Sequence, residues 1–175
     1  DPMDQDVASS RQSPSELHWF GTDQLGRDVF SRIVTGARIT LVVSLSTLLI
    51  AFGVGMVIGL LSGYLGGLTD RILMRLVDMQ LAIPSLVLAL VIVSVLSPGL
   101  LPLVLVVSIM SYPSFARLAR AVTLRVKAEC YVEAAVIVGA SNRRIVLRHI
   151  LPNVLPHTLV LATETFGRVV LSLSS

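Results

Sequence analysis

The sequence predicts an all-α protein, a polytopic bundle of membrane-spanning helices with about four spans. The chain is 54% hydrophobic, only 14% charged, and has a mean hydropathy of +0.82, unlike an average soluble domain. Its apolar residues also lie in long stretches, since residues 39–69 and 79–116 carry no formal charge. A span needs about 20 apolar residues, so the first stretch holds one helix and the second holds two.

Turn and breaker residues divide these stretches into spans. The second stretch is expected to fold back at residues 97–99, where Pro-Gly favours a turn. Pro84 and Pro113 lie within apolar segments and are expected to kink them. A last, weaker span is interrupted by Pro156 and His157, so protein contacts should support it more than lipid does. The predicted spans are residues 39–63, 77–96, 100–119 and 151–171.

The charges predict how the chain is oriented. An excess of Lys and Arg marks the cytoplasmic side of a membrane protein, and residues 117–149 hold the largest excess, with Arg117, Arg120, Arg125, Lys127, Arg143, Arg144 and Arg148 against Glu129 and Glu133. Residues 120–150 are therefore expected to form a cytoplasmic loop within a transmembrane domain of residues 38–175. Residues 1–37 then form a periplasmic N-terminal segment. The chain opens without an initiator Met, and we expect a further helix to precede it.

The cytoplasmic loop contains the most informative pattern. Its Glu133-Ala134-Ala135 run has strong helix propensity and predicts a short helix over 131–138. Gly139 can adopt the left-handed conformation that ends a helix, and Ser141 can cap a second short helix that leads to Pro152 in the first turn of the last span. The result is a rigid, bent pair of helices at the membrane surface. A surface helix bound to lipid headgroups is the alternative.

A second pattern precedes the first span, in the sequence from His18 to Asp28. Gly21 and Gly26 allow tight turns, while Asp23 and Arg27 can join Asp28 in a local frame of ion pairs and hydrogen bonds. Without further information this is an ordinary structured segment before a membrane helix.

Two patterns lie inside the spans. Gly55, Gly59 and Gly63 are spaced four apart, which lets helices approach closely in lipid, and a hinge is the alternative. Glu164 and Arg168 face each other at i, i+4 on the last span. Ionisable groups at membrane depth are functional candidates, so the pair is either structural, near the outer interface, or in contact with substrate.

Several catalytic classes are excluded by missing motifs. The chain has a single Lys, Lys127, and no Gly-Lys-Ser/Thr sequence, so no P-loop is present and any ATP must be hydrolysed by another chain. One Cys and three scattered His give no zinc pattern. We therefore expect a transport subunit that is not an enzyme and binds no cofactor or metal. A secondary transporter or channel that works without an ATPase is the alternative class, although no internal repeat supports it.

Both polar motifs resemble one family. Glu133-Ala134-Ala135, Gly139 and His149-Ile-Leu-Pro152 resemble the cytoplasmic "EAA" loop of binding-protein-dependent ATP-binding-cassette importers, although many importers have Ile where His149 stands. The sequence from Gly21 to Asp28 resembles the "GTD…GRD" element of the dipeptide, oligopeptide and nickel permeases, as the run Arg148–Asn153 also does. The resemblance extends from His18 to about Ser172 and implies the importer-permease (MetI-like) fold.

The resemblance implies roles for particular residues. It places the contact with the ATPase on the coupling loop, at Glu133, Ala134, Ala135, Gly139, Ala140 and Ser141. It places an external gate or scaffold at Gly21, Thr22, Asp23, Gly26, Arg27 and Asp28. It leaves Glu164 and Arg168 as possible lining of the translocation path.

The resemblance also implies partners and a location. They are a second permease subunit, two ATP-binding subunits that carry ATP and Mg, a periplasmic solute-binding protein and membrane lipid, without nucleic acid. The location is the bacterial inner membrane, which the chain crosses several times. Di- or oligopeptides are the expected substrates, because no His/Cys/Met cluster lies in the spans, and nickel or a nickel chelate is the alternative.

Overall fold

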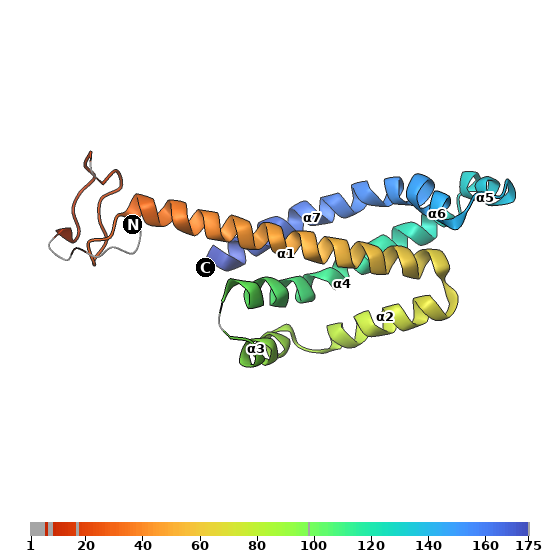
Figure 1. Cartoon of the computed structure of the whole chain (residues 1–175), viewed down its shortest axis with the longest axis horizontal. Helices are drawn as coiled ribbons and strands as arrows, with labels where there is room; N and C mark the ends of the chain where they lie inside the picture. Colours follow the sequence, from red (N-terminus) through yellow and green to blue (C-terminus); the bar gives the residue numbers. More distant parts are fainter. Residues whose placement is uncertain (1–5, 7–8, 17, 98, 175) are drawn as a thin grey trace. The chain divides into compact units, whose positions relative to one another are not determined.

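The computed structural model describes residues 6, 9–16, 18–97 and 99–174, and in this part of the chain the secondary structure is helical (Figure 1). The only β-type pairing among these residues is an isolated bridge between Thr22 and Asp28. Residues up to Val43 form one compact unit, and Ser44–Leu173 form another. The helices are α1 (Val29–Leu65), α2 (Gly67–Ala82), α3 (Ser85–Val95), α4 (Leu100–Lys127), α5 (Cys130–Ile137), α6 (Asn142–Ile145), the π-helical turn η2 (Val146–Ile150) and α7 (Leu151–Ser174).

The predicted helical membrane fold is confirmed. Three helical stretches among the described residues are long and apolar enough to cross a bilayer: α1, α4 and the continuous helix Asn142–Leu173. The pair α2 and α3 makes a fourth span if the two helices are counted together. The helix α1 begins at Val29, well before the predicted span of residues 39–63. Its first turn lies before the uncharged stretch, where the Asp28 carboxylate accepts the backbone N–H of Ser31.

The segment expected as one span at residues 77–96 is two helices instead. α2 already begins at Gly67 and ends at Ala82, and its axis makes an angle of 91° with that of α3. The break lies at Ile83 and Pro84, both of which have extended backbone. Proline lacks an N–H and disfavours helical geometry at the residue before it, so the kink predicted at Pro84 is confirmed and is a full bend. Pro113, by contrast, stays inside α4.

The three spaced glycines bring α1 into close contact with α4. A Cβ built on Gly59 would lie 2.5 Å from the carbonyl oxygen of Ala116 and 2.6 Å from the Ala119 Cβ, and Gly55 and Gly63 meet α4 at similarly short distances. Such distances leave no room for any side chain. The packing role predicted for these glycines is therefore confirmed, since close backbone approach is what small residues provide in membrane helices.

Two ion pairs attach α2 to α4. The Arg120 guanidinium donates to both carboxylate oxygens of Asp70, at 2.5 and 2.6 Å, and the Arg117 Nη2 donates to Asp78 at 2.6 Å. The Ser62 hydroxyl at the end of α1 also donates to Asp70. A bidentate arginine–carboxylate contact fixes orientation as well as distance, so these pairs hold α2 against α4, and Ser62 joins the end of α1 to the first turn of α2.

The last span continues directly from the loop. α6, η2 and α7 form one continuous helical stretch from Asn142, and Pro152 lies in the first turn of α7, as expected. Arg148, the residue four positions before Pro152, lies inside the π turn, and proline has no N–H to donate to its carbonyl oxygen. Buried residues at helical spacing, Val154, Thr158, Ala162, Thr165 and Val169, give α7 its packed face.

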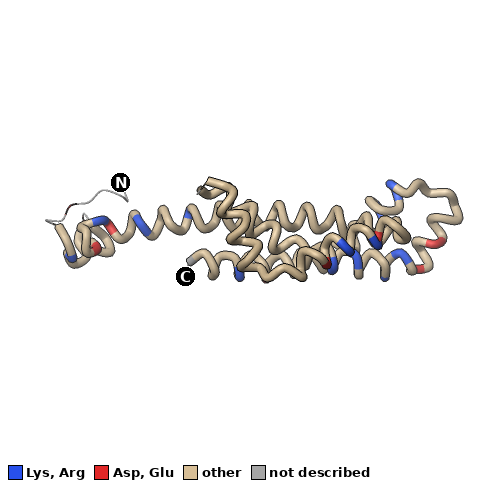
Figure 2. Tube along the Cα trace, turned by 90° about the horizontal axis from the view of Figure 1, so that it is seen from below, with Lys and Arg blue, Asp and Glu red and all other residues tan. Residues whose placement is uncertain are grey.

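The outer surface of the helices suits lipid. Many large apolar side chains are exposed on α1 and α3, and α3 has no buried residue at all among those described. Within Ser44–Leu173, most charged residues gather toward the end of the bundle that carries α5 and α6 (Figure 2). An uncharged belt beside a charged end is the pattern that a bilayer requires.

Candidate functional site

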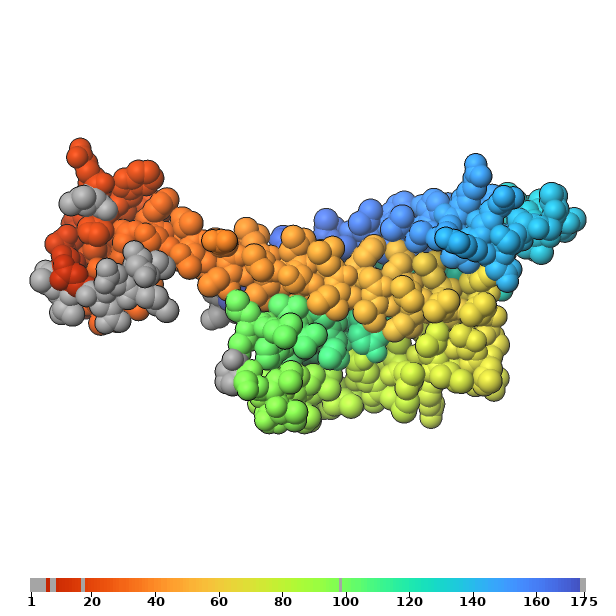
Figure 3. Space-filling model, viewed as in Figure 1, coloured from red at the N-terminus to blue at the C-terminus, as the bar shows by residue number. Residues whose placement is uncertain are grey.

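The loop between α4 and α7 is a bent helical knob, as the sequence predicts. α5 runs over Cys130–Ile137, and Gly139 has a φ of +84°, the left-handed conformation that ends a helix. Ser141 occupies the N-cap position of α6 with extended backbone, although its side chain makes no capping hydrogen bond. In the space-filling view this knob projects beyond the ends of α1 and α2 (Figure 3).

The knob is fixed to the bundle by buried apolar anchors. Val132 of α5 and Ile145 of α6 are each only 1% exposed, and Ile150 of the π turn is fully buried. They join one core cluster with Met56 of α1 and Ala119 of α4. Because protein interiors are close-packed, a displacement of the knob must move the helices that these anchors touch.

Polar contacts add a second attachment at the end of α1. The Tyr64 hydroxyl donates to Asn142 Oδ1 at 2.8 Å, and Lys127 Nζ donates to the Tyr64 carbonyl at 2.7 Å. The Lys127 ammonium also lies 5.5 Å from the centroid of the Tyr64 ring. Tyr64 therefore connects the end of α4 with the start of α6.

The outward face of the knob is apolar at its tip. Val136, Ile137 and Val138 are 57%, 84% and 87% exposed, and we call these three residues the apolar tip. Contiguous exposed apolar residues mark a surface that another protein or a membrane covers. The exposed arginines Arg143, Arg144 and Arg148 follow on the next turns of helix.

The predicted docking residues lie around this tip. Glu133, Ala134 and Gly139 are exposed, while Ala135 and Ala140 are half-buried. Ser141 is exposed at the bend. The structure thus brings all the predicted loop residues together on one knob, and it adds the apolar tip, which the sequence analysis did not single out. The sequence signal that could have identified the tip is a run of three large apolar residues, Val136 to Val138, within a loop that is otherwise rich in charge.

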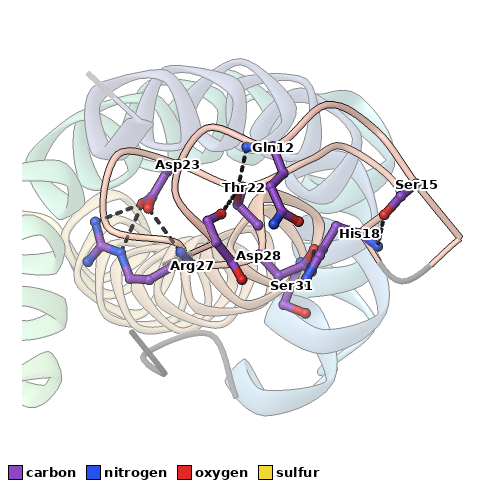
Figure 4. A network of polar contacts seen from close by, with 9 residues as sticks. Gln12, Ser15, His18, Thr22, Asp23, Arg27, Asp28 and Ser31 are labelled. Atoms are coloured by element: carbon purple, nitrogen blue, oxygen red, sulfur yellow. Dashed lines mark hydrogen bonds and ion pairs between the residues drawn. The ribbon is translucent and has the colours of Figure 1, made fainter. Parts of the chain in front are cut away.

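The outer segment is held by a carboxylate at its centre. Asp23 accepts hydrogen bonds from Arg27 Nε at 2.9 Å and from the backbone N–H groups of Leu25 and Arg27 at 2.8 and 3.1 Å (Figure 4). Arg32 of α1 also pairs with it. The predicted network of ion pairs and hydrogen bonds is confirmed, and Asp23 is the acceptor in most of its contacts.

Asp28 has a separate role at the start of α1. Its carboxylate accepts the backbone N–H of Ser31 at 2.8 Å, which is the contact made by an N-cap residue, and α1 begins at Val29. His18 Nδ1 lies 3.1 Å from the other carboxylate oxygen. Asp28 thereby connects the loop to the helix.

The two glycines of the outer segment are required by its turns. Gly21 and Gly26 both have a φ of +72°, and a Cβ on Gly21 would lie 2.3 Å from the Gln12 carbonyl oxygen. Between them, the Thr22 hydroxyl receives the Gln12 N–H at 2.9 Å and donates to the Ser9 carbonyl. Gly21 and Thr22 therefore hold their own stretch of backbone next to the backbone of residues 9–12.

The hydrogen bonds at Asp23 change its titration. Burial raises the pKa of this carboxyl. The hydrogen bonds from the backbone N–H groups of Arg27 and Leu25, and from the Arg27 guanidinium, lower it by more, so that the pKa falls from an ordinary 3.8 to about 2. Since the folded pKa lies below the unfolded one, the carboxylate stabilises the segment above about pH 3.8. That contribution is lost as the pH falls toward about 2.

This titration can be followed through Trp19, the one Trp in the sequence, which is 65% exposed and whose ring centroid lies 5.1 Å from that of Phe30. Because the ring already meets solvent, we follow its fluorescence anisotropy, which should stay constant from neutral pH to about pH 4 and fall between about pH 4 and 2 as the segment loosens. Asp23→Asn should give the lowered anisotropy already at neutral pH, and Glu16→Gln, in an exposed acid of the same segment, should not. A Trp19→Phe variant supplies the blank, and an unchanged anisotropy in Asp23→Asn would contradict the assignment.

The predicted pair on α7 is formed. Arg168 Nη2 donates to Glu164 Oε1 at 3.2 Å, and the two side chains are 67% and 69% exposed. Arg168 lines the α7 side of a groove between α4 and α7, whereas Glu164 does not line it. It is separate from the knob and from the outer segment in sequence.

Several helices long and apolar enough to cross a bilayer, joined by a short exposed loop, define a polytopic helical membrane protein. The chain belongs to the family of binding-protein-dependent transport system inner membrane components, whose profile matches residues 55–175. It is 40% identical over 164 residues to a glutathione transport system permease protein of Pectobacterium atrosepticum, covering 94% of this chain and 54% of that relative. It is 42% identical over 160 residues to a dipeptide transport system permease protein of Alkalihalophilus pseudofirmus, covering 91% of this chain and 53% of that relative.

These comparisons bear on several of the predictions. The predicted importer-permease family and its location in the inner membrane are confirmed. The two relatives are named for glutathione and dipeptide transport. The chain spans about half the length of these relatives.

Proposed function

We propose that this chain forms part of the translocation path of a peptide importer and that the knob of α5 and α6 seats it on a separate ATP-hydrolysing subunit. One observation carries the proposal: an apolar tip that is 57% to 87% exposed sits on a knob that the buried side chains of Val132 and Ile145 anchor to the bundle. Such a surface is costly in water unless a partner covers it. Membership of a binding-protein-dependent transport family supports an ATPase and a binding protein as partners.

The proposal gives each part of the knob a task. The apolar tip and the small residues Ala134 and Gly139 fit into a groove of the ATPase, and the arginines of α6 and η2 meet an acidic rim. The buried anchors Val132 and Ile145 pass the movement to α4 and α7. Closure of the ATPases on ATP and Mg would then tilt the spans and switch the path from inward-open to outward-open.

The remaining partners and the substrate complete the proposal. We infer that two ATP-binding subunits and a second permease complete the complex, and that a periplasmic binding protein delivers peptides to it. The names of the relatives support peptide substrates and do not favour the nickel alternative. We infer that the outer segment, which Asp23 holds together, scaffolds the external gate. The chain itself has no P-loop, which supports its acting without an ATPase site of its own.

Photocrosslinking tests the docking surface. A benzoylphenylalanine placed at Val138, which is 87% exposed, should form an adduct with the ATP-binding subunit when cells are irradiated. Mass spectrometry of the adduct identifies the partner by its P-loop peptide. If the knob instead lay in lipid headgroups, the adduct would contain phospholipid and the proposal would fail.

The same residue introduced at Leu90 is the matched control. Leu90 is an apolar side chain of α3 that is 70% exposed, and α3 lies outside the knob. It should crosslink to lipid or to the second permease, without the ATP-binding subunit. An equal yield of the ATPase adduct from both positions would mean that the crosslink does not report docking.

A further inference from the structure

A polar groove runs between α4 and α7, away from the knob. It has a volume of about 210 Å³ and is lined by Met110, Ser111, Ser114, Thr165, Arg168, Val169 and Ser172. Four of these residues carry hydroxyl groups and one carries a full positive charge. Pockets for drug-sized ligands are larger, about 300–1,000 Å³, so this groove takes one small group of a ligand and not a whole peptide.

The position of the groove makes its polarity informative. Both helices that line it belong to stretches long and apolar enough to cross a bilayer. Charged and hydroxylated side chains in such helices face protein or a water-filled cavity, because exposure to hydrocarbon is costly. The groove therefore faces an aqueous passage or another subunit, and lipid does not cover it.

The charge in the groove selects an anion. Arg168 uses Nη2 to bind Glu164 at 3.2 Å, and the described residues provide no other partner for it. A guanidinium has five N–H donors arranged as a planar fork that matches a carboxylate, so most of its donors remain available. Hydroxyl groups of Ser111 and Ser114 lie on the α4 side of the same groove and can donate to the same anion.

We propose that this groove binds the terminal carboxylate of a peptide in transit, with Arg168 contacting the carboxylate and Glu164 acting as a positioning residue for the guanidinium. The inference rests on the proposed transport of peptides and adds the part of the substrate that the chain recognises. A peptide amide, which lacks the negative charge, should bind poorly.

Protection of an introduced thiol measures this binding directly. The permease carries Ser172→Cys, with Cys130→Ser and any cysteine outside these residues replaced, and it is placed in nanodiscs so that both faces are accessible. Ser172 is exposed, lines the groove and is not one of the two hydroxyl donors of α4. Its replacement is labelled with a methanethiosulfonate reagent in the presence of alanyl-phenylalanine or of the same dipeptide as its C-terminal amide.

The free acid should slow labelling at a concentration about tenfold or more below that needed for the amide, the size expected for hydrogen bonds to a charged group. Arg168→Gln should abolish the difference between the two peptides, and Arg168→Lys should retain part of it because charge remains without the fork. Arg71→Gln, in an exposed arginine of α2 outside the groove, should leave the difference intact. A thiol introduced by Ser141→Cys should be labelled equally with either peptide.

Equal protection by acid and amide, or protection by neither, would overturn the proposal, even if Arg168→Gln fails to fold. Retention of the full acid preference in a folded Arg168→Gln protein would also overturn it and leave the ion pair with a structural role only. The labelling needs neither ATP nor the ATPase. Its failure is therefore distinguishable from a failure of docking, which the crosslink at Val138 reports separately.

Discussion

Gly139→Asp should abolish co-purification of the ATP-binding subunit with the permease while leaving the permease folded. Gly139 has a φ of +84°, and a Cβ built on it has no atom within 4 Å, so the folded chain has room for the new side chain. The carboxylate would project from the bend beside the apolar tip, into the space assigned to the partner. A buried, unpaired charge at a protein interface is strongly unfavourable, so the loss should be at least about a hundredfold in affinity.

Gly67→Asp is the matched control for this experiment. Gly67 also has a positive φ, +55°, and open space around its Cβ, but it is the first residue of α2. The new side chain therefore meets a positive φ and open space in both variants, and the location differs. Binding of the ATPase is measured by affinity pull-down from detergent-solubilised membranes. Equal retention of the ATPase in both variants would show that the bend does not dock.

Gly59→Leu should strongly destabilise the helical bundle. The new Cβ alone would lie 2.5 Å from the Ala116 carbonyl oxygen, which belongs to a helical backbone and cannot move aside as a side chain can. Overpacking of this kind costs about 3 kcal/mol or more. We expect a fall of about 6 °C or more in the melting temperature in detergent, together with a low yield of folded protein.

The control for this substitution lies on the same helix. A Cβ on Gly53 meets no atom within 4 Å, and Gly53 is exposed, so Gly53→Leu adds the same apolar side chain without a clash. Its melting temperature should stay close to that of the unaltered protein. Similar melting temperatures for the two variants would contradict the tight contact between α1 and α4.

The elements that local sequence signals determine were predicted well. The helix over α5, the left-handed Gly139 and the turn glycines Gly21 and Gly26 each follow from the conformational preference of single residues. The close approach of α1 to another helix follows from the spacing of its small residues, whereas the structure identifies that helix as α4. These features depend on short-range chemistry, which a sequence displays directly.

The features that depend on tertiary contacts were not predictable in the same way. Pro84 indicates a kink, but the 91° bend also reflects where Arg117 and Arg120 hold α2 against α4. The π turn before Pro152 and the unbroken helix from Asn142 depend on how the loop packs on the core. Such choices arise from packing that overrides local propensity.

The candidate sites divide along the same line. The residues of the knob lie within one short segment, so a motif could identify them. The groove combines Ser111 and Ser114 with Thr165 and Arg168, which only the register between α4 and α7 brings together. The role of Asp28 as the N-cap of α1 was also missed, because the helix begins before the predicted span.

The side of the membrane on which the knob lies tests the central claim most directly, and the chain carries its own probe. Cys130, the one Cys in the sequence, is exposed at the start of α5. With any cysteine outside these residues replaced, a membrane-impermeant maleimide should label Cys130 in inside-out vesicles stripped of the ATPase and should leave it unlabelled in spheroplasts. Labelling in spheroplasts, with none in inside-out vesicles, would place the knob outside the cell and contradict its docking on a cytoplasmic ATPase.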